Sequence, residues 1–469
     1  MTGETMDKTG MILAGESLLT MDAENSVIRN GAVAILDGRI MGVGTLEAMK
    51  AAFPAYSLKH LANTVLMPGL INAHAHSGFL RGTAEHLPVW DWLTIHINPM
   101  HRVLEPHEAE AASWLCYAES ALSGTTTVVD MWRYMDGSAR AAEAIGTRLL
   151  AVPYVGEHPD YNYFDTLDMN EAMIETWHRK ANGRINVWVG LEHLFYSDEA
   201  GQQRAIEMAK RHKVGFHTHC SEAEVEVGGF IEAYGKRPMY VLEDLGFFEA
   251  PQTMLAHAVW LEPAEIELIS KYRVSVAHNP VSNMKLASGI APIADMLAAG
   301  IPVGLGTDGE KENNNFDMFE EMKAASLLGK LHHRDAAAMD SWQSLRMATI
   351  LGAKAIGLDH EIGSIEVGKR ADIIAVRSDT PRMTPFFPDG PYFNLQHNLV
   401  HAVRGSDVAM TMVDGKIIVE DGQLKTGDLK AIIADIHAMA PAHFARRARW
   451  LAENGGGTKN WISEKGTAE

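Results

Sequence analysis

Two histidines separated by one residue are the part of this sequence best suited to chemistry. His74 and His76 close the segment Pro68-Gly-Leu-Ile-Asn-Ala-His-Ala-His76. Alternate side chains of a strand share a face, so both imidazoles point the same way and can bind one cation. A lone His-x-His pair is weak evidence for a metal site, and its meaning depends on what the other strand ends carry.

Polar or titratable residues also close the later predicted strands: Asp130, His193, His219 with Glu222, His257, His278 and Asp308. In a barrel of parallel strands the carboxyl ends meet at one mouth, where active sites lie. A core hydrogen bond or a helix cap explains one or two such residues, but not a coordinated set. The pattern therefore predicts a metal-dependent hydrolase.

Eight apolar segments are predicted to be strands, over residues 65–76, 125–131, 148–155, 186–193, 214–222, 253–260, 274–283 and 302–309. Stretches with helical apolar spacing lie between them, such as 106–122, 200–212 and 263–271. This alternation predicts an α/β fold with a TIM-like (β/α)₈ barrel. An open doubly wound sheet is the alternative, and the lack of a glycine-rich phosphate loop weakens it.

Two similar hairpins stand near opposite ends of the chain. Residues 31–44 turn at Asp37-Gly38 and residues 409–422 turn at Asp414-Gly415, a dipeptide that favours hairpins. We expect one small β-sandwich domain built from both termini. The predicted division is 1–66 and 363–425 for this domain, 67–362 for the catalytic barrel, and 426–469 for a C-terminal helix and flexible tail.

Composition limits the partners of the protein. The 469 residues carry a net charge of -19, which argues against nucleic acid or an anionic membrane and leaves small molecules as substrates. Only two cysteines occur, the first residues lack a signal-peptide pattern, and no apolar run approaches the ~20 residues of a membrane span. We expect a cytoplasmic protein.

The motifs together resemble the amidohydrolase superfamily, in the branch of S-adenosylhomocysteine/methylthioadenosine deaminases and s-triazine hydrolases. The resemblance spans roughly residues 10–425 and is carried by Pro68–His76, Leu80-Arg-Gly82, His219-Cys-Ser-Glu222, His257, His278-Asn-Pro280, Ser282-Asn283, Gly306-Thr-Asp-Gly309 and Gly363-Ser-Ile-Glu-Val-Gly-Lys-Arg-Ala-Asp372. Members of this family commonly form oligomers, so the resemblance implies a homo-oligomer.

The resemblance implies that His74, His76, His219 and Asp308 bind a divalent metal. Imidazole and carboxylate ligands suit Zn²⁺, and Fe²⁺ or another divalent ion would fit nearly as well. Dinuclear relatives carry a carboxylated lysine at the end of strand 4, where this chain has Gly190-Leu-Glu-His193. We therefore expect one metal.

The same resemblance assigns roles in catalysis. A metal-bound hydroxide attacks the substrate, Asp308 accepts the water proton, and His257 steadies the hydroxide. Glu222 protonates a ring nitrogen of the substrate. The other interpretation of Glu222 is a carboxylate stabilised by a helix N-terminus. His193 is a candidate for substrate binding, with a buried structural role as the alternative, whereas Asp130 is expected to be structural.

The positions that grip a nucleoside depart from the family pattern. His101 replaces the glutamate that binds ribose hydroxyls, the strand-3 arginine is missing from Leu149-Leu-Ala-Val-Pro153, and Glu310-Lys-Glu312 replaces small residues after Asp308. These changes argue against adenosine-type substrates, because buried polar groups would be left poorly paired. Trp92 and neighbouring aromatic residues line a flat pocket or serve only in packing.

The primary hypothesis is an aminohydrolase that replaces an amino group of an N-heteroaromatic ring with oxygen. The alternative is removal of another leaving group, such as chloride, alkylamine or an amide or urea nitrogen, from a triazine-like or xenobiotic substrate. A catalytically silent barrel used in binding or assembly is a further alternative, and the presence of every expected ligand argues against it.

Overall fold

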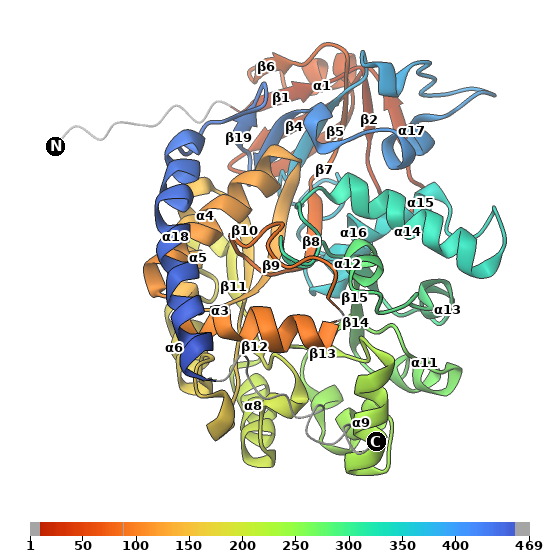
Figure 1. The fold of residues 1–469 in the computed structure, drawn as a ribbon. Coiled ribbons are helices and arrows are strands. Elements are labelled where there is room, and N and C mark those ends of the chain that lie inside the picture. The colour runs from red at the N-terminus through yellow and green to blue at the C-terminus, as the bar shows by residue number, and fades with distance from the viewer. Residues whose placement is uncertain (1–9, 88, 455–469) are drawn as a thin grey trace.

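The computed structural model describes residues 10–87 and 89–454, whose strands form four sheets (Figure 1). Two sheets are entirely parallel: β8 (Leu70–Ala75), β9 (Thr125–Trp132), β10 (Arg148–Pro153) and β11 (Ile185–Val187) form one, and β12 (Val189–Gly190), β13 (Phe216–Cys220), β14 (Thr253–His257), β15 (Val274–His278) and β16 (Val303–Leu305) form the other. The fold is therefore mixed α/β around parallel strands, as the sequence predicts.

Backbone hydrogen bonds connect the two parallel sheets. Trp188 alone separates β11 from β12, and its N–H donates to the carbonyl of Ala151 over 3.0 Å. At the other edge the N–H of Asp308, just after β16, donates to the carbonyl of His74 in β8 over 3.0 Å. The strand ends that carry the predicted site residues are thus held in one continuous arrangement.

Helices connect the parallel strands: α4 (Pro106–Leu122), α5 (Met135–Ile145), α6 (Leu167–Trp177), α8 (Glu199–His212), α9 (Glu224–Tyr234), α10 (Pro238–Asp244), α11 (Pro263–Ile269), α12 (Pro280–Lys285) and α13 (Ile293–Ala298). Three more helices follow the last parallel strand: α14 (Met318–His333), α15 (Ser341–Met347) and α16 (Ile350–Ala355). The helix predicted over 106–122 is confirmed as α4. It begins at Pro106, whose ring pre-sets a helical φ, and a capping box of Glu105 and Glu108 satisfies its first N–H groups.

The single strand predicted over 65–76 is wrong, because the structure has two strands there. β7 (Thr64–Pro68) pairs antiparallel with β17 (Ile373–Arg377), whereas β8 pairs with β9 in a different sheet. The chain changes sheets at Gly69, where a Cβ atom would lie 2.2 Å from the side chain of Thr126. Only glycine fits this crossing, and an apolar pattern does not show such a break.

Strands from both ends of the chain share one seven-stranded sheet, in the order β20 (Gln423–Leu424), β19 (Lys416–Glu420), β18 (Val408–Val413), β17, β7, β2 (Ser17–Leu19) and β3 (Val27–Arg29). A four-stranded sheet has the order β5 (Arg39–Thr45), β4 (Gly31–Leu36), β1 (Met11–Ala14) and β6 (Ser57–His60), with α1 (Leu46–Ala52) beside it. A buried cluster includes Leu13, Val33, Ile373 and Met410 from both sheets.

Both predicted hairpins are confirmed. Their Asp-Gly turns have nearly identical left-handed backbones, with φ of 50° and 76° at Asp37-Gly38 and again at Asp414-Gly415. The two turns lie against each other, since the N–H of Ala371 donates to Gly38 and the N–H of Gly415 donates to Ala371. Segments far apart in the sequence are tied together at this point.

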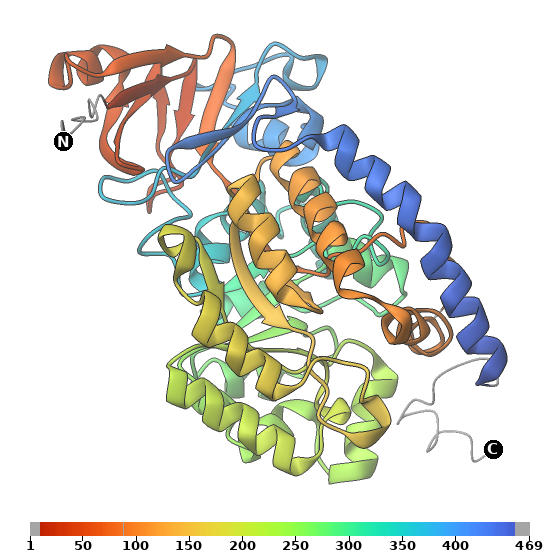
Figure 2. The same cartoon turned by 90° about the vertical axis from the view of Figure 1, so that its left-hand side faces the viewer.

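The last helix, α18 (Leu429–Glu453), runs along the outside of α4 and α3 (Asn98–Val103) (Figure 2). His443 on α18 shares a 2.9 Å hydrogen bond with the buried carboxylate of Glu108. The flexible tail predicted after this helix, residues 455–469, lies outside the described residues. Across the described chain no helix has the length and apolar character needed to span a membrane.

A buried ion pair connects the parallel strands to the seven-stranded sheet. Arg148 on β10 donates to Asp372, with Nη2 3.0 Å from Oδ1, and the same oxygen accepts the N–H of Asp414 over 2.8 Å. Asp372→Ala would remove the nearest carboxylate from the buried guanidinium and leave it only Asp414, whose Oδ1 lies 3.7 Å from Nη2. We expect a loss of about 3–5 kcal/mol in the free energy of unfolding, measured by denaturant titration.

The exposed pair of Arg29 and Asp389 provides the control. Asp389→Ala removes the same type of interaction from the surface and should change stability by less than about 1 kcal/mol. Equal effects of the two substitutions would contradict a structural role for the buried pair.

Candidate active site

The structure brings the four predicted metal ligands together in the protein interior. His74 lies on β8 and His76 directly after it, His219 lies on β13, and Asp308 follows β16. Nε2 of His76 is 3.2 Å from Nε2 of His219, and Oδ1 of Asp308 is 3.5 Å from Nε2 of His74 and 3.3 Å from Nε2 of His76. All four side chains are buried.

Hydrogen bonds fix which nitrogen of each imidazole faces the centre. Nδ1 of His76 lies 2.6 Å from the carbonyl of Met131, and Nδ1 of His219 lies 2.7 Å from the carbonyl of Glu192. A carbonyl can only accept, so both Nδ1 atoms carry the proton and both Nε2 atoms present a lone pair.

His74 is oriented through a second histidine. Its Nδ1 lies 2.9 Å from Nε2 of His217, whose own Nδ1 lies 2.9 Å from the carbonyl of Met254. His217 must therefore donate to Met254 and accept from His74. Nε2 of His74 is left as a buried atom with no hydrogen-bond partner in the described part of the chain.

This arrangement fits a divalent cation. Burial lowers the pKa of His76 to about 3 and holds the pKa values of His74 and His219 well below the usual range, so all three imidazoles are neutral. Two imidazole lone pairs 3.2 Å apart repel each other unless a cation lies between them. Neutral imidazoles with outward N–H groups held by acceptors, plus one carboxylate, form a typical donor set for zinc or iron.

His257, Glu222 and Asp308 face one another beside these ligands. Nε2 of His257 is 3.9 Å from Oε2 of Glu222 and 3.8 Å from Oδ2 of Asp308. Asn283 fixes the His257 ring at Nδ1 over 2.9 Å, and Ser282 donates to Oδ2 of Asp308 over 2.7 Å. Burial raises the pKa of Glu222, which favours the protonated form of its carboxyl group.

Two of these residues have an uncommon backbone. His257 has φ of 72° and Asp308 has φ of 62°, in the left-handed region that residues other than glycine rarely adopt. Each stands where a parallel strand ends and the chain turns outward. Such strain tends to collect at functional sites, where it aims a side chain at the centre.

His193 belongs to a buried network that the sequence does not predict. Its Nδ1 lies 2.7 Å from Glu192, whose other oxygen accepts a 2.9 Å hydrogen bond from the hydroxyl of Tyr154. Burial alone would lower the pKa of His193, but the Glu192 carboxylate outweighs it and raises the pKa to about 9. Nε2 of His193 has no partner among the described residues and lines the cavity as a donor.

The cavity at the site has a polar wall and an apolar wall. Val89, Trp92, Leu93 and Leu286 form the apolar part of the lining, and histidines and carboxylates form the polar part. Its volume is about 20 Å³, close to the space for one water molecule. A ring can enter only when part of the apolar wall moves.

His101 was predicted to bind substrate but does not line this cavity. Its ring stacks on Tyr154 with centroids 4.7 Å apart and an interplanar angle of 16°, and Tyr154 lies between it and the site. Asp130 accepts hydrogen bonds from Ser77 and from the hydroxyl of Tyr117, which is a structural arrangement.

Two further residues belong to the site: His217, which was not predicted, and Glu312, which the sequence singled out only as part of Glu310-Lys-Glu312. His217 forms a second His-x-His pair with His219, a signal that the spacing did offer. Glu312 also lines the cavity and pairs with the buried Lys311, with Nζ 2.9 Å from Oε1. Burial raises the pKa of Glu312, whereas the paired ammonium of Lys311 opposes this shift and favours the charged carboxylate.

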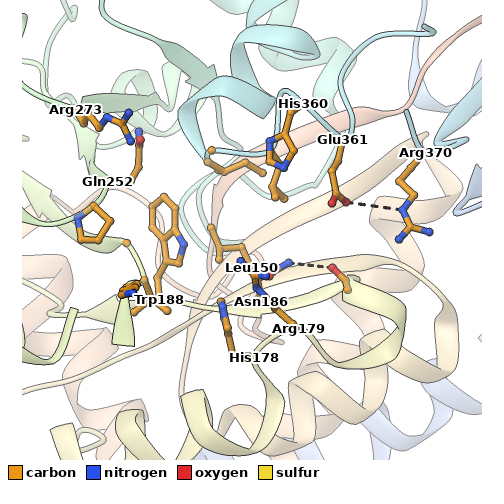
Figure 3. Close-up of a pocket in the computed structure, with 18 of the residues that line it drawn as sticks. Leu150, His178, Arg179, Asn186, Trp188, Gln252, Arg273, His360, Glu361 and Arg370 are labelled. Atoms are coloured by element: carbon orange, nitrogen blue, oxygen red, sulfur yellow. Dashed lines mark hydrogen bonds and ion pairs between the residues drawn. The ribbon is translucent and has the colours of Figure 1, made fainter. Parts of the chain in front are cut away.

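A larger cavity, of about 640 Å³, lies at the amino ends of the parallel strands (Figure 3). It is lined by Leu150, Trp188, Gln252, Arg273 and His360, among others. Of the groups of described residues that could hold a metal ion, none lies there. Cavity size therefore does not locate the chemistry in this protein, whereas the clustering of ligands does.

Comparison with known proteins identifies the family. The model of the amidohydrolase family matches residues 65–418, which contain all of the clustered ligands. The chain belongs to the amidohydrolase family. Among its relatives is the 5-methylthioadenosine/S-adenosylhomocysteine deaminase of Syntrophomonas wolfei, 38% identical over 90% of this chain and 97% of that protein. The 5'-deoxyadenosine deaminase of Methanosarcina acetivorans is 37% identical over 93% and 99% of the two chains.

Solved structures of other amidohydrolases resemble this one. An adenosine deaminase from Xanthomonas campestris with bound zinc has a TM-score of 0.87 and 27% identity, covering 93% of this chain and 99% of that one. An atrazine chlorohydrolase from Arthrobacter aurescens has a TM-score of 0.79 and 24% identity, covering 92% and 99%, and this likeness concerns the fold alone. The resemblance to this amidohydrolase branch is thereby confirmed.

The orientation of His74 gives a prediction about metal affinity. His217→Phe keeps the ring volume but removes the nitrogen that accepts from His74 Nδ1. We expect metal affinity to fall about 10–100-fold, measured by competition with a chelator. His76→Ala, which removes a ligand itself, should abolish stoichiometric binding.

His101→Phe is the matched control, because His101 is equally buried but lies behind Tyr154. It should leave metal affinity unchanged. If His217→Phe binds metal as tightly as the unaltered protein, the orienting role of His217 is wrong.

Proposed function

We propose that this amidohydrolase is a metal-dependent aminohydrolase that replaces an amino group on an N-heteroaromatic ring with oxygen. The observation that carries the proposal is the buried convergence of His74, His76, His219 and Asp308, with Glu222 and His257 beside them. The relatives at 37–38% identity are named as deaminases of adenosine-type compounds, which supports hydrolysis of a carbon–nitrogen bond.

The proposed ligands of a single divalent cation are His74, His76, His219 and Asp308. We favour Zn²⁺, because a zinc ion is bound in the related adenosine deaminase and three imidazoles with one carboxylate suit it. When bound, such a cation lowers the pKa of water and supplies a nucleophile near neutral pH.

The chain's own residues would move the protons. Asp308 accepts a proton from the attacking water, and the fixed ring of His257, 3.8 Å from Asp308, holds that water in line. Glu222 passes its proton to the substrate ring nitrogen, and Asp308 gives the proton taken from water to the departing amino group. Glu222 then recovers a proton from the new C–OH group as ammonia leaves. Its turn is rigid, because the carboxylate of Glu226 accepts the N–H groups of Ser221 and Glu222 over 2.9 and 2.7 Å.

The substrate ring would lie between the two walls of the cavity. Trp92 covers one face, and the imidazolium of His193 donates from Nε2 to an acceptor on the ring. His101 would take part in binding only if Tyr154 turned away, so its proposed role is to support that tyrosine. This role of His101 differs from that of the glutamate at the same position in the nucleoside deaminases, which binds the ribose hydroxyls directly.

The proposed architecture follows from the sheets. We propose that the two parallel sheets close into one (β/α)₈ barrel across residues 67–362. The four- and seven-stranded sheets would form a small β-sandwich domain from residues 1–66 and 363–425, followed by a C-terminal segment, 426–469. We also propose a homo-oligomer located in the cytoplasm.

The reaction class can be tested directly. The metal-loaded protein, assayed for ammonia release across aminopurines, aminopyrimidines and amino-1,3,5-triazines, should deaminate at least one ring. Parallel assays for chloride and alkylamine separate the alternative leaving groups. Release of halide or alkylamine without ammonia would contradict the proposed function.

The role of Glu222 gives a second test. Glu222→Gln keeps the shape of the side chain but cannot carry the proton, so kcat should fall about 10²–10⁴-fold with metal content unchanged. Glu224→Gln, two residues later and exposed, is the control and should be neutral. Near-normal turnover by Glu222→Gln would remove this residue from the proton transfer.

A further inference from the structure

A carboxylate outside the predicted set faces the reaction centre. Glu312 is buried and lines the cavity of the site, with Oε1 bound to Lys311. Its other oxygen, Oε2, has no hydrogen-bond partner in the described part of the chain. A buried carboxylate oxygen without a donor costs free energy, and a ligand that supplies the donor would recover it.

The backbone is built to hold Glu312 in this position. A Cβ atom at Gly309 would lie 2.1 Å from Oε2 of Glu312 and 2.8 Å from Nζ of Lys311, so the carboxylate folds back over a glycine. Glu310 anchors the same turn, because its Oε1 accepts the N–H of Leu80 over 2.9 Å. Residues 309–312 therefore hold the side chain of Glu312 in place at the cavity.

Glu312 lies beside the proposed metal ligands. One ligand atom each of His76, Asp308 and Glu312 lie within 4.8 Å of one another. Because Glu312 lines the same cavity as Glu222, His257 and Asp308, a ring attacked at this centre would have the atom next to the attacked carbon against Glu312. The sugar of a purine nucleoside would lie at the opposite end of the base, away from this carboxylate.

The two flanks of the attacked carbon then face different groups. Glu222, 3.9 Å from His257, serves the flank where a ring nitrogen takes up a proton. The other flank of the attacked carbon faces Glu312, whose carboxylate is paired with the ammonium group of Lys311. In adenine that flank is a ring carbon with an acceptor nitrogen beyond it, which offers Glu312 no donor. In a 2-amino-4-oxopyrimidine unit it is a ring N–H.

We propose that Glu312 determines substrate specificity by accepting the ring N–H next to the attacked carbon, so that the preferred substrates are aminated lactam rings of the 2-amino-4-oxopyrimidine type. This inference rests on the proposed function and names the substrate class for the same site. A carboxylate that accepts such a donor forms a charge-assisted hydrogen bond, about twice as strong as a neutral one.

The experiment compares matched pairs of rings with and without the donor. The pairs are 2-amino-4-oxopyrimidine with its 3-methyl derivative, and guanine with 1-methylguanine, and adenosine is the reference. In the metal-loaded protein, methylation should lower kcat/KM by about tenfold or more. Glu312→Gln should lower kcat/KM for the unmethylated rings by about tenfold and should no longer distinguish the two members of a pair.

Glu224→Gln is the control, because it makes the same change in an exposed carboxylate that does not line the cavity. It should keep the discrimination between the paired rings. Metal content is measured for both variants, and each should retain the full amount.

Three results would overturn the inference. Loss of metal from Glu312→Gln would make this residue a ligand instead. If Glu312→Gln still prefers the unmethylated rings as strongly as the unaltered protein does, Glu312 does not accept the ring N–H. A higher kcat/KM for adenosine than for the lactam rings would indicate a protonated Glu312 that donates, and it would leave the proposed deamination intact.

Absence of ammonia release from every compound would instead contradict the proposed function. Equilibrium binding of the same pairs to Glu222→Gln protein, measured by calorimetry, then decides the inference by itself. Tighter binding of the unmethylated rings supports it, and equal binding of both members overturns it.

Discussion

The mutual orientation of three buried imidazoles is the constraint on which the rest of the site depends. The carbonyls of Met131 and Glu192 accept from His76 and His219, and His217 accepts from His74, so each Nε2 lone pair points inward. Neutral rings with lone pairs 3.2 Å apart are unfavourable in a buried centre without a cation. A cation held between these lone pairs would therefore stabilise the arrangement.

The parallel strands explain why these groups can be held so closely. Backbone carbonyls in or beside the neighbouring strands accept from His76 and His219, and His74 is held through His217, which donates to the carbonyl of Met254 on the next strand. The hydrogen-bonded sheet that sets the strand positions therefore also sets the ring orientations. At the ends of β14 and β16 the left-handed backbones of His257 and Asp308 turn side chains toward the same point. Substitution of a residue that contacts a ligand, such as His217, should therefore change the orientation of the ligand and not remove it.

Much of this could be predicted from the sequence because ligand types and strand periodicity are local signals. His74, His76, His219 and Asp308 each close an apolar segment, and parallel topology alone makes such ends converge. The two Asp-Gly hairpins could also be predicted, because the turn residues and the apolar runs beside them are adjacent in the sequence. The break at Gly69 was not predicted, because it depends on the close approach of Thr126 from another strand.

Contacts between distant segments explain the remaining differences. His101 occupies the expected position along the chain, yet Tyr154 separates it from the cavity, and spacing cannot show which of two stacked rings faces inward. Glu310-Lys-Glu312 was visible as a departure from the family pattern. Only the structure shows that Glu312 enters the site while Glu310 binds the backbone at Leu80.

The most direct test of the account is anomalous diffraction from a crystal of the metal-loaded protein, recorded at the absorption edge of zinc. The account predicts one strong peak per chain, within bonding distance of His74, His76, His219 and Asp308. A second peak between His76, Asp308 and Glu312, or no peak at a site whose histidines keep the same orientation, would contradict it.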